Sequence, residues 1–200
     1  MGDMAPSTVV LGPDDGLSGT LASELDAITV AREGELPPGI TGAVIVADPC
    51  PQPVETVMVD GNDWRRLVDD SMWRMLTALQ RVRSALATDG GRIVVVIPTI
   101  GIAGAAGLLA YTTAIEGIRA MVKSAARQWS SSGIGVNLVA TPLSLFGDGT
   151  AAGHLTVAAV TDDSTLMRTV AESVKFLLRP GLDHLAGETV VADGGSVMLP

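Results

Sequence analysis

Clustered positive charge is scarce in this sequence: 13 lysines and arginines stand against 22 aspartates and glutamates, for a formal net charge of −9. Binding to nucleic-acid phosphates or to an anionic lipid surface requires clustered basic side chains. We therefore expect neither a nucleic-acid partner nor a membrane partner. Long apolar runs are also lacking, and no stretch reaches the length that spanning a bilayer requires.

Cysteine is nearly absent, since Cys50 stands alone and cannot form an internal disulfide bond. It has no cationic neighbour in the sequence to activate it, so a nucleophilic role is not expected. The segment at residues 1–6 has neither a basic region nor an apolar run, which together with the cysteine count predicts a cytoplasmic protein. His154 and His184 lack the spacing of a metal site, so no metal is expected.

Aromatic side chains make up only 3% of the chain, yet 47% of the residues are hydrophobic and 23 are glycine. Short β-branched runs alternate with helical periodicity, which predicts an α/β fold with a doubly wound parallel sheet in a single domain over 1–200. The expected strands cover 8–12, 27–31, 42–47, 92–97, 135–140 and 188–193; the expected helices cover 17–25, 62–86, 108–130 and 164–178, the last with Ser164 as its N-cap.

The helix expected at 62–86 is apolar beyond the stripe that one sheet surface would cover. Trp73 widens that stripe, which suggests a second surface buried against a partner, although a helix sunk in its own core remains an alternative. Ile118, on the helix at 108–130, is expected at the same interface. Gly117 on that helix costs about 1 kcal/mol relative to alanine. We expect a close backbone approach to another helix as the reason for it.

Three segments carry a family resemblance. They are the stretch from Gly91 to Tyr111, the Ser-Gly-Ile-Gly-Val-Asn segment at 132–137, and the ending Gly-Glu-Thr-Val-Val-Ala-Asp-Gly-Gly at 187–195. Their order and spacing make the chain similar to the short-chain dehydrogenase/reductase family over essentially its whole length, particularly to the acyl-carrier-protein and hydroxyacyl reductases. The resemblance implies a Rossmann-like fold, an NAD(P) cofactor and redox chemistry on a hydroxyl or carbonyl group.

The catalytic positions of that family are mostly changed. Its Tyr-x-x-x-Lys motif reads Tyr111 and Ile115 here, its serine thirteen residues before the tyrosine reads Pro98, and its relay asparagine reads Ser71. A tyrosine ionises near pH 10 and needs a nearby cation to work as an acid or base at neutral pH, which isoleucine does not supply. The Asn-Asn-Ala-Gly turn of the family reads Ala-Asp-Pro-Cys at 47–50. Tyr111 could equally be a half-buried tyrosine that packs at the start of a helix.

The cofactor loop of the family, Gly-x-x-x-Gly-x-Gly, corresponds here to Gly12, Gly16 and Ser18. Two glycines keep the tight turn, but Asp14 and Asp15 place carboxylates where a pyrophosphate would seek the amino end of a helix. Like charges oppose such binding. The alternative is that both aspartates stabilise the start of the helix.

The chain is also short on the adenine side. About ten residues separate the strand ending near 31 from the strand starting at 42, too few for the helix and strand that the family places there. That unit normally helps to wall the adenine pocket. Arg32 lies where a residue selective for NADP could lie, although a lone arginine in a turn is more commonly a solvated charge.

Three hypotheses follow. The first is a catalytically degenerate subunit that needs no cofactor and forms a homo-oligomer, or pairs with an active relative, through the helices near 62–86 and 108–130. The second is an oxidoreductase that uses NAD or NADP on a hydroxyl or ketone of the 3-oxoacyl type, with Tyr111 as the acid; Lys123 is too far along its helix to replace the missing lysine. The third is a regulator that binds a small molecule in the vacated cleft.

Overall fold

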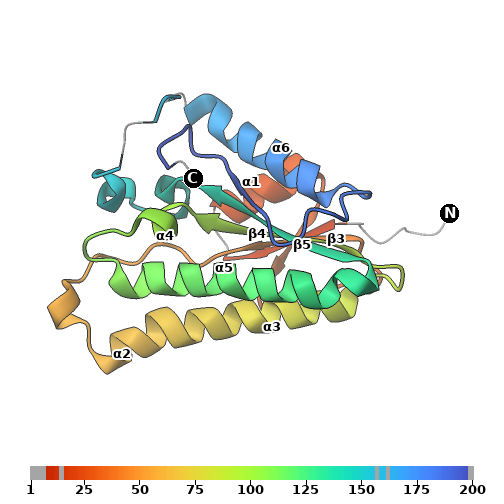
Figure 1. Ribbon diagram of the computed structural model, residues 1–200, viewed down its shortest axis with the longest axis horizontal. Coiled ribbons are helices and arrows are strands. Elements are labelled where there is room, and N and C mark those ends of the chain that lie inside the picture. Colours follow the sequence, from red (N-terminus) through yellow and green to blue (C-terminus); the bar gives the residue numbers. More distant parts are fainter. Residues whose placement is uncertain (1–7, 14–15, 156–157, 161–162, 198–200) are drawn as a thin grey trace.

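The sheet has six parallel strands in the order β2-β1-β3-β4-β5-β6. The computed structural model describes residues 8–13, 16–155, 158–160 and 163–197. The doubly wound α/β prediction is confirmed, because helices cover both faces: α1 and α6 lie on one side and α3 and α5 on the other (Figure 1). The strands are β1 (Thr8–Gly12), β2 (Ile28–Ala31), β3 (Gly42–Val46), β4 (Gly91–Pro98), β5 (Ile134–Thr141) and β6 (Thr189–Val191).

The middle of the sheet is buried on both faces. All five residues of β3 and nearly all residues of β4 and β5 are buried, which is why these strands are continuous apolar runs rather than alternating ones. β4 and β5 pair over eight positions, from Gly91 opposite Ile134 to Pro98 opposite Thr141. This pairing is the longest in the sheet, whose two central strands are β3 and β4.

Each predicted helix is present within a few residues, but the helix expected at 62–86 is not a single α-helix. It consists of a short α-helix, a π-helical turn and a long α-helix, and the sequence did not predict the π-helical turn. The α-helices are α1 (Gly16–Leu25), α2 (Gly61–Trp64), α3 (Asp70–Ala85), α4 (Ile100–Ala103), α5 (Leu109–Trp129) and α6 (Leu166–Leu178); the π-helical turn is η2 (Arg65–Asp69); the 3-10 turns are η1 (Thr56–Met58), η3 (Ser130–Ser132), η4 (Leu143–Phe146), η5 (Gly149–Ala152) and η6 (Asp163–Thr165).

Helix starts were predicted less well than helix cores. Ser164 is not the N-cap of α6, because it lies inside η6 and Thr165 precedes the first residue of α6. The cap that the sequence did not predict is Asp60, whose carboxylate accepts hydrogen bonds of 2.8 Å from the backbone amides of Asn62 and Asp63 at the start of α2.

The connection between β2 and β3 contains turns and no helix, so the predicted shortening of the fold is confirmed. β2 is therefore the edge of the sheet on this side. Arg81 holds this connection against α3, because its guanidinium donates hydrogen bonds to the carbonyl groups of Arg32 and Gly34.

The two long helices α3 and α5 lie side by side (Figure 1). A Cβ atom at Gly117 would lie 2.8 Å from the terminal methyl of Met72 on α3, so the expected close approach of the backbone at Gly117 to another helix is confirmed. Ile118 is fully buried in the core of this chain, so its expected place at a partner interface is wrong. Trp73, in contrast, points outward and is 64% exposed.

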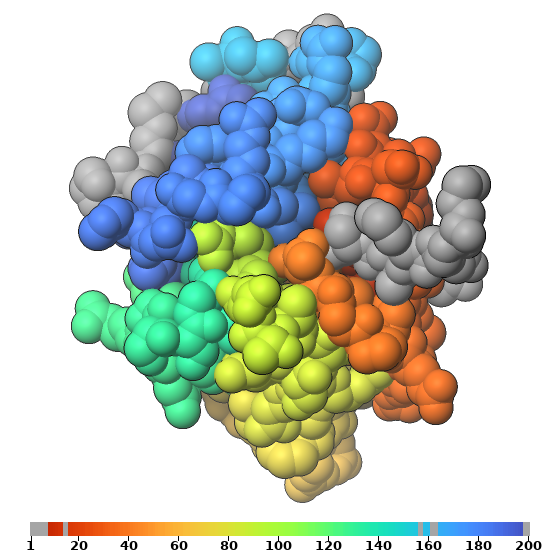
Figure 2. Space-filling view, turned by 90° about the vertical axis from the view of Figure 1, so that its right-hand side faces the viewer, coloured from red at the N-terminus to blue at the C-terminus, as the bar shows by residue number. Residues whose placement is uncertain are grey.

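The amino ends of the strands are closed by Arg92 at the start of β4. Its guanidinium donates to Asp183 at 2.6 Å and to the carbonyl oxygens of Arg179 and Gly133 at 3.3 and 3.1 Å. Figure 2 views this end, where the blue segment after α6 lies against the yellow-green segment that leads into β4. A functional cleft is therefore to be sought at the other end of the sheet.

Candidate active site

The carboxyl ends of β1 and β3 flank the point where the chain changes direction across the sheet. β2 lies outside β1, and the chain then returns to place β3 on the other side of β1. In open α/β sheets, ligands bind in the crevice at this position. Gly12 ends β1, Val46 ends β3, and the turn at 47–50 follows.

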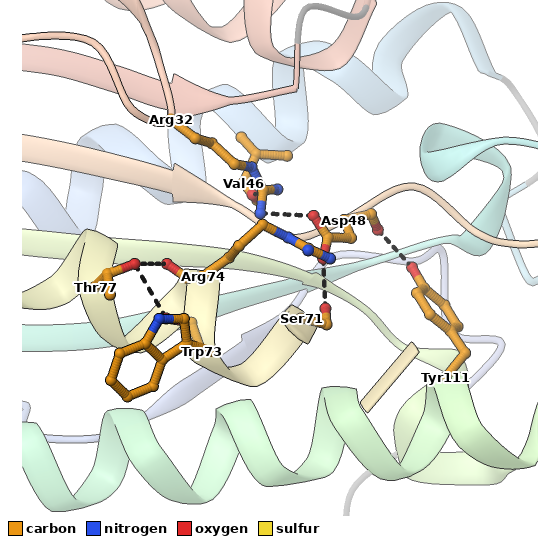
Figure 3. A network of polar contacts seen from close by, with 8 residues as sticks. All are labelled: Arg32, Val46, Asp48, Ser71, Trp73, Arg74, Thr77 and Tyr111. Carbon is orange, nitrogen blue, oxygen red and sulfur yellow. Dashed lines mark hydrogen bonds and ion pairs between the residues drawn. The ribbon is translucent and has the colours of Figure 1, made fainter. Parts of the chain in front are cut away.

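Tyr111 lies in the first turn of α5 and is only 2% exposed. Its hydroxyl donates a hydrogen bond of 2.8 Å to the backbone carbonyl oxygen of Asp48 (Figure 3). Burial raises the pKa of Tyr111 far above its ordinary value, Cys50 and Asp48 raise it further, and Arg32 opposes them only in part. At neutral pH this side chain is a phenol whose proton points at a backbone carbonyl.

The three companion positions supply no cation. Ile115, one turn after Tyr111, is fully buried among apolar side chains. Pro98 is buried at the end of β4, and the neighbouring Thr99 is also buried. Ser71, on α3, does keep a hydroxyl near Tyr111, but this hydroxyl donates to the carboxylate of Asp48 at 2.5 Å.

Asp48 joins most of the polar groups at this end of the sheet. One carboxylate oxygen lies 2.6 Å from the guanidinium of Arg32, and the other lies 2.9 Å from Arg74 and accepts from Ser71 (Figure 3). We call Arg32, Asp48, Ser71 and Arg74 the Asp48 cluster. The family resemblance placed Asp48 in the turn at 47–50 but gave it no role, and Arg74 was not named as a site residue. A signal for Arg74 was its spacing, since it follows Ser71 by three residues and so shares its helix face.

The predicted cofactor-loop residues are only partly brought together. A Cβ atom at Gly12 would lie 2.2 Å from the hydroxyl oxygen of Ser18, which is fully buried, so this glycine lets α1 pack closely on β1. Around Gly16, by contrast, a Cβ would meet nothing within 4 Å. Asp14 and Asp15 lie outside the described residues. Gly12 and Ser18 therefore have a packing role in this structure.

Arg32 is not a solvated charge, because only 15% of its side chain is exposed. It follows β2, and its guanidinium donates to the carbonyl oxygen of Val46 at the end of β3, at 2.6 Å, as well as to Asp48. Because β1 lies between β2 and β3, this side chain passes across the carboxyl end of β1 at Gly12. A dinucleotide bound at the switch point would meet the Arg32 side chain, so the residues as arranged do not fit the cofactor.

The remaining candidates add no reactive group. Burial raises the pKa of Cys50, and the Asp148 carboxylate raises it further, so the thiol stays protonated at neutral pH. The Nε2 atom of His154 lies 2.9 Å from the Gly104 carbonyl oxygen and its Nδ1 atom 3.2 Å from that of Ala151, so this side chain links two loops. Among the described residues no three histidine, cysteine or acidic side chains are grouped to hold a metal ion, and none of the described helices is long and apolar enough to cross a membrane.

Comparisons with known proteins agree on the class of protein. A family model described as Enoyl-(Acyl carrier protein) reductase matches residues 39–197. The chain is 30% identical over 147 residues to the 3-oxoacyl-[acyl-carrier-protein] reductase FabG of Vibrio harveyi, covering 69% of this chain and 59% of that protein. It is 33% identical over 145 residues to the cis-4-hydroxycyclohexanecarboxylate dehydrogenase of Sinomonas cyclohexanicum, covering 66% and 55%.

A third relative, carbonyl reductase family member 4 of Danio rerio, is 33% identical over 136 residues, covering 62% of this chain and 52% of that protein. The match thus spans less than two thirds of each relative. A short-chain type dehydrogenase/reductase from Mycobacterium ulcerans has the same fold, with a TM-score of 0.72 over 94% of this chain and 89% of that chain at 17% identity. The family model begins at residue 39, after β1, α1 and β2, so Gly12 and Arg32 lie outside its match.

Proposed function

The chain belongs to the short-chain dehydrogenase/reductase family, and from that premise we propose that it is a subunit without hydride-transfer chemistry at Tyr111. It acts in an oligomer, either with copies of itself or with a catalytically active relative. One observation carries the proposal: the Tyr111 hydroxyl is buried, has no lysine one turn along its helix, and donates to the Asp48 carbonyl.

The chemical reason lies in what a general acid must do. It has to deliver its proton to the substrate oxygen and then carry negative charge, so its pKa must lie near the working pH. Burial pushes the pKa of Tyr111 in the opposite direction, and Ile115 offers no compensating charge. Arg32 lowers the pKa of Tyr111 in part, but its guanidinium is held by Asp48 and Val46.

The absence of a cofactor is part of the same proposal. Arg32 crosses the crevice in which a dinucleotide would lie, and the adenine-side strand and helix are missing between β2 and β3. We therefore expect neither NAD nor NADP to bind appreciably. No step of a redox reaction is assigned to the chain.

The test uses the purified full chain. We expect no oxidation of NADH or NADPH with a panel of β-ketoacyl thioesters and cyclic ketones, and no cofactor binding by titration calorimetry. Low-micromolar binding together with turnover would overturn the proposal.

An NAD(P)-dependent oxidoreductase acting on a hydroxyl or ketone is the second candidate, and the comparisons favour it over the first. All three relatives are named as reductases or dehydrogenases. In this case Arg32 or Arg74 would have to leave Asp48 and act as the missing cation. Tyr111→Phe separates the two candidates, because it would abolish turnover by an oxidoreductase and would change nothing in a subunit that has none.

The outer surface of α2 and α3 supports the oligomer part of the proposal. Trp64 and Trp73 are 39% and 64% exposed, and Val57 and Met58 in the preceding turn η1 are exposed as well. Monomeric proteins rarely leave apolar side chains gathered in water. Ile118→Glu would disrupt the core, since Ile118 is fully buried, so it is no test of an interface.

Trp73→Glu is the suitable variant, with Ser23→Glu as its matched control, because Ser23 is exposed on α1 at the opposite face of the sheet. In light scattering we expect the first to lower the mass and the second to leave it unchanged. If the wild-type chain is monomeric at high concentration, the proposed self-association is wrong. Mass spectrometry of the protein purified from its host would then show whether an active relative accompanies it.

A further inference from the structure

A cavity of about 300 Å³ opens beside the Asp48 cluster, between the turn at 47–51 and the helical segment formed by η2 and α3. One part of its wall is apolar and comes from Leu67, Pro49 and Pro51. The other part is polar and carries two arginines, Arg66 and Arg74, with Asp48, Ser71, Tyr111 and Cys50 completing the lining. The volume is at the lower end of the range for small-molecule sites.

The lining of this cavity carries two arginines and one carboxylate, that of Asp48, which contacts the guanidinium groups of Arg32 and Arg74. Arg66 is paired with Asp63, 3.0 Å away, and the Asp148 carboxylate also acts on Cys50 in the lining. An anion that enters the cavity is therefore attracted by the exposed guanidinium groups of Arg66 and Arg74 rather than by a net positive charge, in a chain whose net charge is −9.

Arg74 has donors left for a ligand. It contacts Asp48 through one terminal nitrogen, and its other guanidinium nitrogens have no hydrogen-bond partner among the described residues. Its side chain is 41% exposed, and that of Arg66 is 62% exposed. The planar guanidinium group matches the two oxygens of a carboxylate, and such charge-assisted hydrogen bonds are among the stronger ones.

We propose that this cavity binds a small organic carboxylate, with the carboxylate on Arg74 and Arg66 and a short apolar portion against Leu67, Pro49 and Pro51. An inorganic anion would satisfy the arginines alone and leave the apolar wall in water, which favours the organic ligand. The proposal goes beyond a subunit role, and it rests on that role in one respect: Tyr111 and Asp48 stay bound to each other rather than taking part in hydride transfer.

Titration calorimetry on the full chain tests the site with three probes at matched ionic strength: hexanoate, hexanamide and sulfate. Hexanoate should bind, and hexanamide, which has the same shape without the charge, should bind at least about tenfold more weakly because a charged hydrogen bond is lost. Sulfate should also be weaker. If hexanamide bound as tightly as hexanoate, the site would not recognise the negative charge. If sulfate bound as tightly as hexanoate, the apolar wall would contribute nothing and the proposal of an organic ligand would be wrong.

Arg74→Gln should weaken hexanoate binding by about tenfold or more for the same reason. Arg83→Gln, on the same helix but away from the cavity, is the matched control and should bind like wild type. If Arg74→Gln fails to fold, Arg66→Gln takes its place, because its exposed side chain has little part in stability.

Hexanoate affinity that is absent in wild type, or unchanged in both cavity variants, would overturn the site. NAD(P)H turnover bears on the proposed function alone and is measured separately. The two proposals can therefore fail independently of each other.

Discussion

The half of the sheet around β4 and β5 differs from the half with β1 and β2 in the length of its strand pairing and in its burial. β4 and β5 pair over eight positions and are buried almost throughout, whereas β1 and β2 pair over four, and three of the four residues of β2 are exposed. The family match covers the first side and begins only at residue 39. The scaffold is thus kept where strands form the core, and it is reduced where the family holds its dinucleotide.

The carboxyl end of the sheet shows the same contrast at the level of side chains. Ile115 and Pro98 are apolar residues buried at positions where the family has chemistry, so they belong to the core. Near the carboxyl ends of β1 and β3 the residues are polar instead. Here Arg32, Asp48 and Arg74 form ion pairs across the crevice. Apolar packing thus occupies the positions around Ile115 and Pro98, and ion pairs occupy the carboxyl ends of β1 and β3.

The largest effect should come from restoring the two family residues in the core. Ile115→Lys with Pro98→Ser places an uncompensated charge in a fully buried site, which should lower the free energy of unfolding by about 3–5 kcal/mol in urea denaturation. No hydride transfer should appear with either nicotinamide cofactor. Ile115→Met, which conserves volume, should cost less than about 1.5 kcal/mol. Clear turnover above wild type would mean that the crevice accepts a dinucleotide after all.

A smaller loss of stability is expected when the hydrogen-bonding side chain of Asn137 on β5 is removed. Asn137 on β5 is 1% exposed, donates to the carbonyl oxygen of Leu185 and accepts from the amide of Glu188, both at 2.9 Å. Asn137→Ala removes a buried side chain together with both of its hydrogen bonds, which should cost about 2–4 kcal/mol in urea denaturation. Asn62→Ala, at an exposed position of α2, should stay within about 0.5 kcal/mol. Equal effects of the two would contradict the role of Asn137.

Asp48→Ala should lower stability by removing the ion pairs of the Asp48 cluster. This change removes the carboxylate that pairs with Arg32, whose side chain is only 15% exposed but keeps the Val46 carbonyl group as a partner. We expect a loss of about 2–3 kcal/mol in the free energy of unfolding, less than the ~3–5 kcal/mol of a fully buried pair, because solvent reaches the site. Glu172→Ala breaks the exposed Glu172–Lys175 pair on α6 and should cost little, since exposed pairs have a median near zero. A loss of the same size in both variants, measured by thermal and urea unfolding, would show that the Asp48 cluster is an ordinary surface ion pair.

Much of the fold could be predicted from the sequence, because continuous apolar runs and helical periodicity are local signals. β3, β4 and β5 are such runs, and α5 is long enough for its period to stand out. The four-residue helix α4 and the π-helical turn η2 were not predicted, since elements this short depend on contacts with the rest of the molecule.

The candidate site was predictable only where family spacing fixes positions along the chain. That spacing pointed to Tyr111 and Ile115, one turn apart at the start of α5. It also placed Arg32, Ser71 and the turn that holds Asp48, but not the ion pairs of the Asp48 cluster, because Arg74 is 26 residues from Asp48 and Arg32 reaches it from a third element. Nor could the burial of Ile118 be predicted in this way, because it depends on how α5 packs on the sheet beside α3.

One measurement tests most directly the claim that the Tyr111 hydroxyl is not activated, and the sequence makes its result simple to interpret. Tyr111 is the single tyrosine, so protein grown with tyrosine carbon-13-labelled at Cζ gives one resonance, whose position reports whether the hydroxyl is ionised.

We predict that this resonance keeps its phenol position as the pH rises past 10 until the protein unfolds, because burial raises the pKa of Tyr111 in the folded state. The unfolded tyrosine ionises near pH 10 while the folded one does not, so the contribution of this group to stability is complete below about pH 10 and is lost as the pH rises further. A tyrosine that titrates in the folded protein with a midpoint below 10 would contradict the account, because it would show an activated hydroxyl of the kind that catalysis requires.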